Sequence, residues 1–319
     1  MKISVVIPVK NGGATLDRCL SSIRAQTLQD IEIIIFDSMS TDDSREIALK
    51  YKVSMKEIPE GSFNHGLTRN LGVEQAQGDL IFFTVQDAWL EDNDALEKMA
   101  AHFENKAVMG VVGHQAVPHE LDKNPLLWFK RFSEPTPTYR RVNDWEEFTQ
   151  LPDAVQQALI AWDNVVAMYR RAALLKQPFV ATEFAEDCIW CRDALMKGWL
   201  LVHDPSIVIY HYHHQSYQYA YKVAYAVNYH FYKFFEIEPR LPPLLKFTAE
   251  ATWHLGKHPA LGFKQKMHWI FHNYSSRLGS FNSHINFLWH LKTGGEDAIE
   301  KRYRKVCKVI PQGKQKESR

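Results

Sequence analysis

Cysteines are few, charge is balanced and long apolar runs are missing in this sequence. Its 319 residues contain 4 cysteines, too few for a disulfide framework. The formal net charge is +1, which gives no argument for nucleic-acid binding. No stretch stays apolar for the ~18 residues that cross a bilayer, and the opening apolar run breaks at residues 10–13. We therefore expect neither a signal peptide nor a membrane span, and a location in the cytoplasm or peripherally on the inner face of the cell membrane.

Short apolar strands alternate with helical patterns in the N-terminal half. The β-branched runs at residues 3–9 and 31–36 are typical of buried parallel strands, and a polar turn and a helix follow each. This alternation predicts an α/β fold with a parallel sheet. Ligands of such sheets bind beyond the carboxyl ends of the strands, where we expect residues 8–11, 37–40 and 86–88 to meet.

A single carboxylate, Asp87, follows the apolar run at residues 80–85. A buried charge without a partner is costly, so this carboxylate needs a cation or a hydrogen-bond donor. A divalent metal that carries a diphosphate is one solution, because hard cations take oxygen ligands. The other is a helix N-cap for residues 88–103, a position that aspartate favours. The residues alone leave both open.

Several motifs, in this order, resemble those of glycosyltransferase family 2. Residues 7–11 (Ile-Pro-Val-Lys-Asn) are similar to its opening strand, and residues 37–42 (Asp-Ser-Met-Ser-Thr-Asp) to its base- and ribose-binding turn. Residues 68–72 (Thr-Arg-Asn-Leu-Gly) resemble the helix before the metal strand. The resemblance runs from Ile3 to about His214 and implies the nucleotide-diphospho-sugar transferase fold, GT-A, with a mostly parallel central sheet.

The implied domains are a GT-A catalytic domain at residues 1–215 and a helical, aromatic-rich C-terminal region at residues 216–319. Most family members carry Asp-x-Asp at the metal, whereas this chain has Gln-Asp-Ala at residues 86–88. With the Phe-Asn-His-Gly-Leu-Thr-Arg-Asn sequence of residues 63–70, this motif resembles the branch that transfers rhamnose from a deoxythymidine diphosphate (dTDP) donor. The resemblance implies a donor nucleotide site formed by Pro8, Val9, Lys10, Asp37, Ser38, Arg69 and Gln86.

Two acids, Glu186 and Asp187, resemble the Glu-Asp motif that begins a helix in the family. The resemblance implies that Asp187 is the general base toward the acceptor hydroxyl, with Glu186 as a neighbour that orients loops. An acid near a helix N-terminus is expected to keep a low pKa and stay ionised. Without the resemblance, an ordinary first-turn acid is the simpler interpretation. Trp190 is a weaker candidate for the acceptor side.

Three histidines, His211, His213 and His214, follow an apolar strand at residues 206–209. Neutral imidazole binds divalent metals, although a single histidine is more often structural. The resemblance implies that His211 completes, with Asp87, the protein ligands of Mg²⁺ or Mn²⁺. His213 and His214 could instead meet phosphate or acceptor.

Aromatic residues crowd the region after residue 216, among lysines and arginines. Such side chains suit a bilayer interface, where rings sink and cations meet anionic headgroups. The alternative is a helical subdomain that packs its aromatics against the catalytic domain or against a second subunit of a homodimer.

The motifs together predict an inverting glycosyltransferase. The expected reaction moves L-rhamnose from dTDP-rhamnose to a hydroxyl of a cell-envelope polysaccharide, such as O-antigen, or of a lipid-linked glycan. A transferase that uses a uridine diphosphate (UDP) sugar and a non-catalytic sugar-nucleotide-binding protein are the alternatives.

Overall fold

The structure is a computed structural model that describes residues 1–129, 136–142 and 144–307. Its contacts divide the chain into two compact units. The first unit comprises Met1–Ala116 and Arg131–His211, and the second comprises Val117–Lys130 and Tyr212–Arg319. The predicted C-terminal region began at residue 216, whereas the second unit begins at Tyr212 and also contains the segment 117–130. The end of the predicted C-terminal region, residues 308–319, lies outside the described residues.

A central sheet, nine-stranded within the described residues, forms the first unit. Its strands are β1 (Ile3–Val9), β2 (Ile31–Asp37), β3 (Ser54–Glu57), β4 (Leu80–Phe83), β5 (Ala88–Leu90), β6 (Val108–Ala116), β7 (Thr138–Arg140), β8 (Ala167–Arg170) and β9 (Leu200–His211). Their order is β3-β2-β1-β4-β8-β6-β9-β5, and β7 pairs with β9. Strands β1 to β4 run parallel, whereas β8 is antiparallel to both neighbours, as β5 and β7 are to β9. The sheet is therefore mixed: its parallel half is the part in which strands and helices alternate along the sequence.

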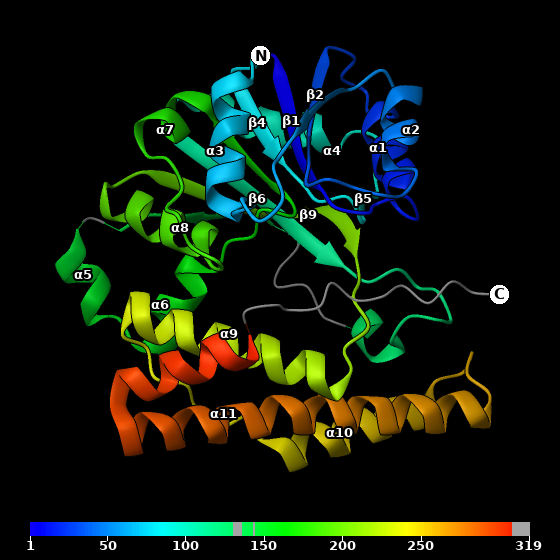
Figure 1. Ribbon diagram of the computed structural model, residues 1–319, viewed down its shortest axis with the longest axis vertical. Helices are drawn as coiled ribbons and strands as arrows, with labels where there is room; N and C mark the ends of the chain where they lie inside the picture. The colour runs from blue at the N-terminus through cyan, green and yellow to red at the C-terminus, as the bar shows by residue number, and fades with distance from the viewer. Residues whose placement is uncertain (130–135, 143, 308–319) are drawn as a thin grey trace. The chain divides into compact units, whose positions relative to one another are not determined.

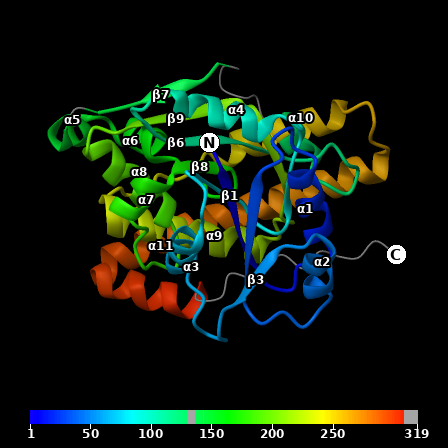
Figure 2. The same ribbon diagram turned by 90° about the horizontal axis from the view of Figure 1, so that it is seen from above.

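Helices cover both faces of this sheet. Figures 1 and 2 show α1 and α2 on one face and α3 and α7 on the other. Neighbouring residues of β1 serve the two faces, because Val5 packs with Leu16 of α1 whereas Val6 lies against Gly72 of α3. A Cβ atom on Gly72 would lie 2.5 Å from Val6 Cγ1, so α3 approaches the sheet this closely only because it has glycine there. The helices of this unit are α1 (Leu16–Arg24), α2 (Ser44–Lys50), α3 (His65–Gln75), α4 (Ala95–Ala101), the 3-10 helix η1 (His102–Glu104), α5 (Trp145–Gln150), α6 (Asp153–Ile160), α7 (Arg171–Lys176) and α8 (Glu186–Met196).

The second unit is helical. It consists of the 3-10 helix η2 (Pro125–Phe129) and of α9 (Tyr217–Phe235), α10 (Leu244–Lys257) and α11 (Phe263–Val306). The long α11 changes direction at Gly295, whose φ of 62° is not helical. Tyr303, beyond this kink, stacks on Tyr229 of α9 with ring centres 4.4 Å apart. In the part of the chain that the structure describes, none of the helices is long and apolar enough to cross a bilayer.

The carboxyl ends of β1, β2 and β4 meet at one edge of the sheet, as the register Val9 to Asp37 shows. The turns that follow these strands therefore lie next to one another. The residues after Asp87 form strand β5, in which Ala88 pairs with His211 at the end of β9. The helix predicted at residues 88–103 is therefore wrong in its first turns, and Asp87 is not its N-cap. This pairing instead brings Asp87 to His211.

Candidate active site

The turns after β1 and β4 are fastened to each other by Gln86. The backbone N–H of Lys10 donates to Gln86 Oε1 (2.7 Å), and Gln86 Nε2 donates to the carbonyl oxygen of Lys10 (3.0 Å). Lys10 Nζ in turn donates to the carbonyl oxygens of Ser38 (2.5 Å) and Met39 (2.9 Å). Two residues predicted to bind the nucleotide, Lys10 and Gln86, thus fix the shape of the sheet edge in the free chain.

Asp37 is fully buried where β2 ends. The backbone N–H and the hydroxyl of Ser40 donate to its Oδ1, the former at 3.1 Å, and Arg45 Nε lies 3.4 Å from its Oδ2. These contacts hold the Asp37 carboxylate in a fixed position. Around it, Val9 is buried, whereas Pro8 and Ser38 are half-buried and retain exposed surface at this edge.

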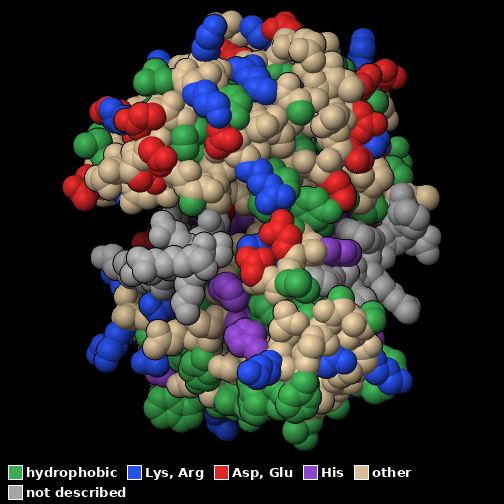
Figure 3. Space-filling model, turned by 90° about the vertical axis from the view of Figure 1, so that its right-hand side faces the viewer, with side chains coloured by type: hydrophobic (Ala, Val, Ile, Leu, Met, Phe, Trp, Pro, Cys, Tyr) green, Lys and Arg blue, Asp and Glu red, His purple; other side chains and the backbone are tan. Residues whose placement is uncertain are grey.

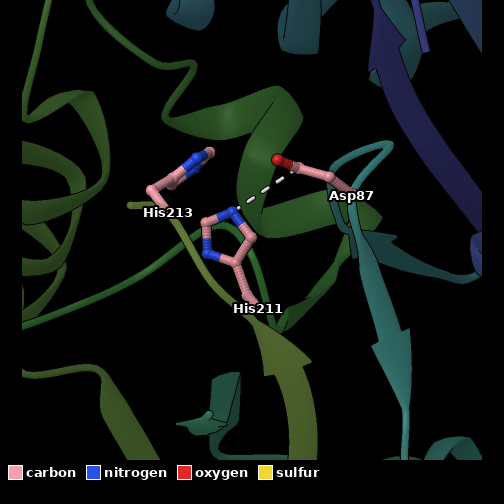
Figure 4. A group of neighbouring side chains, drawn as sticks. All are labelled: Asp87, His211 and His213. Carbon is pink, nitrogen blue, oxygen red and sulfur yellow. Dashed lines mark ion pairs between the residues drawn. The ribbon is translucent and has the colours of Figure 1, made fainter. Parts of the chain in front are cut away.

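The predicted metal ligands Asp87 and His211 face each other. His211 Nε2 lies 3.5 Å from Asp87 Oδ1, and both side chains are mostly buried. Figure 4 draws His213 with them; it follows His211 by two residues, and the possible ligand atoms of the three side chains lie within 4.8 Å of one another. Asp87 and His211 both belong to the first unit. Imidazole and carboxylate are ligands that Mn²⁺ or Mg²⁺ accepts.

Gln115 determines which nitrogen of His211 faces Asp87. Gln115 Nε2 donates to Oδ2 of Asp163, a carboxylate that only accepts, so Gln115 Oε1 is the atom that faces His211. This oxygen lies 2.9 Å from His211 Nδ1, which must therefore carry the proton. In neutral His211, Nε2 then has its lone pair on the side of Asp87, the form in which imidazole binds a metal ion.

The two predicted acids, Glu186 and Asp187, begin helix α8. Asp187 accepts hydrogen bonds from the backbone N–H groups of Asn164 (3.2 Å, to Oδ2) and Cys188 (2.8 Å, to Oδ1). Glu186 forms a buried ion pair with Arg69 and also accepts from the Asn164 side chain at 3.4 Å. Arg69, predicted to lie at the nucleotide, thus pairs with the carboxylate next to Asp187.

Burial, and then the negative charges of Glu186 and Asp163, raise the pKa of Asp187 to about 8. Arg69 and the Asn164 N–H act in the opposite direction without outweighing them. The low pKa expected at a helix N-terminus is therefore wrong, because two neighbouring carboxylates and burial exceed the effect of the helix dipole. A carboxylate with a pKa near neutral pH is a stronger proton acceptor than an ordinary aspartate.

Comparison with known proteins bears on this geometry. Residues 4–159 match the family model described as glycosyl transferase family 2. They are a family 2 glycosyltransferase domain. Over 128 residues the chain is 38% identical to the O-antigen chain rhamnosyltransferase RfbN of Salmonella typhimurium, with 40% of each protein covered. It is 39% identical over 125 residues to WbaN of Salmonella anatum, an O-antigen chain rhamnosyltransferase, with 39% of each covered. The chain thus spans about two fifths of the length of the curated relatives it matches.

The fold extends further than this sequence match. The mannosyltransferase PcManGT of Pyrobaculum calidifontis superimposes with a TM-score of 0.53 over 97% of this chain and 84% of that one, at 17% identity. The family 2 domain therefore belongs to a chain with the GT-A fold, in which Asp87 lies inside the matched residues and Asp187 and His211 lie beyond them.

Trp190, predicted on the acceptor side, lies in the core of the first unit. Trp190 is 1% exposed, donates its indole N–H to the carbonyl oxygen of Gln177 (2.8 Å) and packs edge-on against Tyr169. It is a core residue without surface to offer a ligand, because its position on α8 turns toward the sheet. The neighbouring Tyr169 hydroxyl supports Asn164 from the same core by a hydrogen bond of 2.5 Å.

Three further residues of the site were not predicted: Gln115, Asp163 and Asn164. Gln115 is far from both acids in the sequence and reaches His211 only because β6 pairs with β9, in register with Ile209. Asp163 and Asn164 form a polar pair just before the apolar residues of β8. Polar residues next to a buried strand are the signal that could have identified these two.

Proposed function

We propose that this chain is an inverting glycosyltransferase, in which an acceptor hydroxyl displaces a nucleoside diphosphate from the anomeric carbon of a donor sugar. One observation carries the proposal, a series of side-chain contacts that runs from Asp87 through His211 and Gln115 to Asp163. The charge of Asp163 acts on Asp187, so these contacts connect the proposed metal ligands with the proposed base. A group for the leaving diphosphate and a group for the attacking hydroxyl thus belong to one connected network in a family 2 protein.

Asp187 is the proposed base. As the acceptor oxygen forms its bond to the anomeric carbon, the bond from that carbon to the diphosphate breaks and the hydroxyl proton passes to the Asp187 carboxylate. Its raised pKa favours this transfer, provided that the carboxylate is ionised at the start. The backbone N–H groups of Asn164 and Cys188 hold both of its oxygens in place.

Asp87 and His211 fit a divalent ion, because a carboxylate oxygen and an imidazole nitrogen, Nε2, face each other at 3.5 Å. Bound there, Mg²⁺ or Mn²⁺ supplies positive charge against the charge that develops on the departing diphosphate. PcManGT, which shares the fold, is described with GDP-Man and Mn²⁺. Gln115 keeps His211 in the tautomer that this role requires.

The proposed donor is dTDP-rhamnose. Support comes from the identity of 38% and 39%, over 128 and 125 residues, to two O-antigen chain rhamnosyltransferases. Asp37, Ser38 and the backbone of Pro8 and Val9 are proposed to receive the nucleotide, at the edge that Lys10 and Gln86 hold in shape. A hydroxyl of a cell-envelope polysaccharide or lipid-linked glycan is the proposed acceptor.

A bilayer surface is the proposed location of that acceptor. Figure 3 shows hydrophobic side chains with Lys and Arg among them along the lower edge of the molecule, over α10 and α11. Trp253 is 56% exposed and carries Lys257 Nζ 4.2 Å above its ring. The exposed large hydrophobic residues of these helices also include Leu245, Phe263, Phe271 and Trp289. Rings and lysines together suit an anionic interface.

Donor screening tests the proposal. Thermal unfolding is measured with dTDP-rhamnose, UDP-N-acetylglucosamine and GDP-mannose, each with and without Mn²⁺, together with release of the nucleoside diphosphate in the presence of cell-envelope glycan. We expect the largest stabilisation, and release, with dTDP-rhamnose. Stronger stabilisation by the UDP-sugar would contradict the donor assignment alone. Stabilisation by a donor without release under any condition would instead identify a sugar-nucleotide-binding protein.

A further inference from the structure

A cavity of about 540 Å³ lies entirely within the second unit, between α9, α10 and α11. Its volume is in the range of sites that bind small molecules. One wall is apolar and the other is polar. Helix α9 contributes the apolar wall with Ala220, Val223, Ala224 and Val227, and α11 contributes the polar wall with Asn273, Ser276, Arg277, Ser280 and His284.

Arg277 brings a positive charge to this cavity. Among the residues that the structure describes, its guanidinium has no hydrogen bond or ion pair, and it lies 5.1 Å from the ring centre of Phe247. Burial lowers the pKa of Arg277, and the charge of Glu250 compensates only in part. A partly desolvated guanidinium of this kind favours a phosphate or carboxylate, which it can hold through two hydrogen bonds.

Asn228 is the second polar group that lacks a partner. It is 5% exposed, it lines the same cavity, and its Nδ2 has no acceptor within the described part of the chain. A buried donor without an acceptor costs free energy. By contrast, Asn124 and Asn273, also in the lining, exchange hydrogen bonds of 2.9 and 3.0 Å and are satisfied. Arg277 and Asn228 therefore give the cavity a cation and an unpaired donor, and both suit an anionic acceptor.

The cavity also adjoins exposed apolar surface. Leu244 and Phe247 line it, and Phe247 is 38% exposed, while Leu245 between them is 86% exposed. Apolar surface of α9 inside the cavity and of α10 at its edge is thus available to an apolar chain. We propose that this cavity binds a lipid phosphate, with the phosphate on Arg277 and Asn228 and a single apolar chain along the Ala220 to Val227 wall.

This proposal concerns the second unit alone and stands whether or not the chain transfers a sugar. The test is binding to the full chain, by titration calorimetry, of farnesyl phosphate, which has both features. Farnesol lacks the phosphate, and inorganic phosphate lacks the chain. We expect farnesyl phosphate to bind at least about tenfold more tightly than either, since the charged hydrogen bonds and the apolar burial both contribute.

Two variants locate the site. Arg277→Gln should weaken farnesyl phosphate about tenfold or more and leave farnesol unchanged, whereas Ala224→Phe should weaken both ligands by filling the apolar wall. Lys264→Gln, which removes an exposed positive charge from the same helix, is the matched control and should bind like the unmodified protein.

Three outcomes would overturn the proposal: equal binding by Arg277→Gln and the unmodified chain, equal affinity for inorganic phosphate and farnesyl phosphate, or binding only to phosphatidylglycerol vesicles and not to dissolved farnesyl phosphate. The last would assign the interaction to the helix surface. If a variant fails to fold, the proposal is tested on the unmodified protein by measuring its affinity for geranyl, farnesyl and geranylgeranyl phosphates. Affinity should rise with chain length until the cavity is filled, and a flat series would contradict the site.

Discussion

The acids of the candidate active site and Arg277 in the cavity of the helical unit differ in how far they are paired. At the sheet edge, Asp187, Glu186 and Asp163 each have named partners, and even the amide of Gln115 uses both ends. In the helical unit, Arg277 has neither hydrogen bond nor ion pair among the described residues. The first arrangement fixes groups in advance of a reaction, as electrostatic preorganisation requires. The second leaves the Arg277 guanidinium available to bind the proposed anionic ligand.

The largest effect is expected at the base. Asp187→Asn should lower transfer by about 10²- to 10⁴-fold, because the amide keeps the shape but cannot take the proton. Donor-induced thermal stabilisation should stay nearly unchanged. Asp193→Asn, the same change later on α8 at a residue paired with Arg192, is the control. Normal turnover of Asp187→Asn would remove this residue from the mechanism.

The buried ion pair gives the next largest effect. Arg69→Met should destabilise the protein by about 3–5 kcal/mol, because Glu186 would remain buried with its charge unpaired. Denaturant unfolding measures this change. Lys50→Met breaks the exposed pair with Asp17 and should have little effect. If the two variants were equally stable, the buried pair of Arg69 and Glu186 would contribute no more to folding than an exposed one.

Gln115→Leu should weaken Mn²⁺ binding by about 10- to 100-fold, as is usual when the group that orients a histidine ligand is removed. The leucine keeps the volume of the side chain but leaves the tautomer of His211 undetermined. Calorimetric titration with Mn²⁺ measures the effect, and Asp87→Asn provides the comparison for loss of a ligand. Mn²⁺ affinity unchanged in both variants would show that this pair does not hold the metal.

The pH dependence should follow Asp187. Because its carboxylate acts as the base, kcat/KM should rise with pH and level off above the pKa of about 8. Asp163→Asn should move this midpoint to lower pH, since it removes a like charge while its amide oxygen still accepts from Gln115. A midpoint that does not move would exclude Asp163 as a cause.

The stability of the folded chain should fall as the pH rises, whereas kcat/KM rises. Between pH 3.8 and about 8, the folded chain keeps a proton on Asp187 that the unfolded chain releases. The contribution of this group to stability is therefore complete below that window and is lost as the pH rises through it. Asp187→Asn should lose less stability than the unmodified chain over the same range, which thermal unfolding at several pH values can measure.

The sequence was informative where function depends on local order. Asp87 and the Glu186-Asp187 pair could be found because they follow a strand or begin a helix, and such positions are visible as patterns. Contacts across the sheet could not be found in this way. Gln115 meets His211 through the pairing of β6 with β9, and nothing in its neighbours along the chain indicates that partner.

Quantities that depend on burial were also out of reach. The pKa of Asp187 was predicted to be low, whereas it is raised, because the sequence does not reveal that Asp163 lies near it. Trp190 was predicted on the acceptor side, although packing buries it in the core, and the sequence does not show which face of α8 is buried. The same limit concealed strand β5, a three-residue strand that exists because β9 is available to pair with it.

The insertion of residues 117–130 into the helical unit constrains the order in which the chain can fold during synthesis. Asn124 leaves the ribosome early, yet the partner of its amide, Asn273, is 149 positions further on. At about 5–20 residues per second, this segment waits seconds for its partner, while β1, β2 and β4 already pair with close neighbours in the chain. A chain cut after residue 215 would lack Asn273 and the helices that follow. Leu126 and Leu127 would then stay exposed as a site for aggregation or chaperone binding.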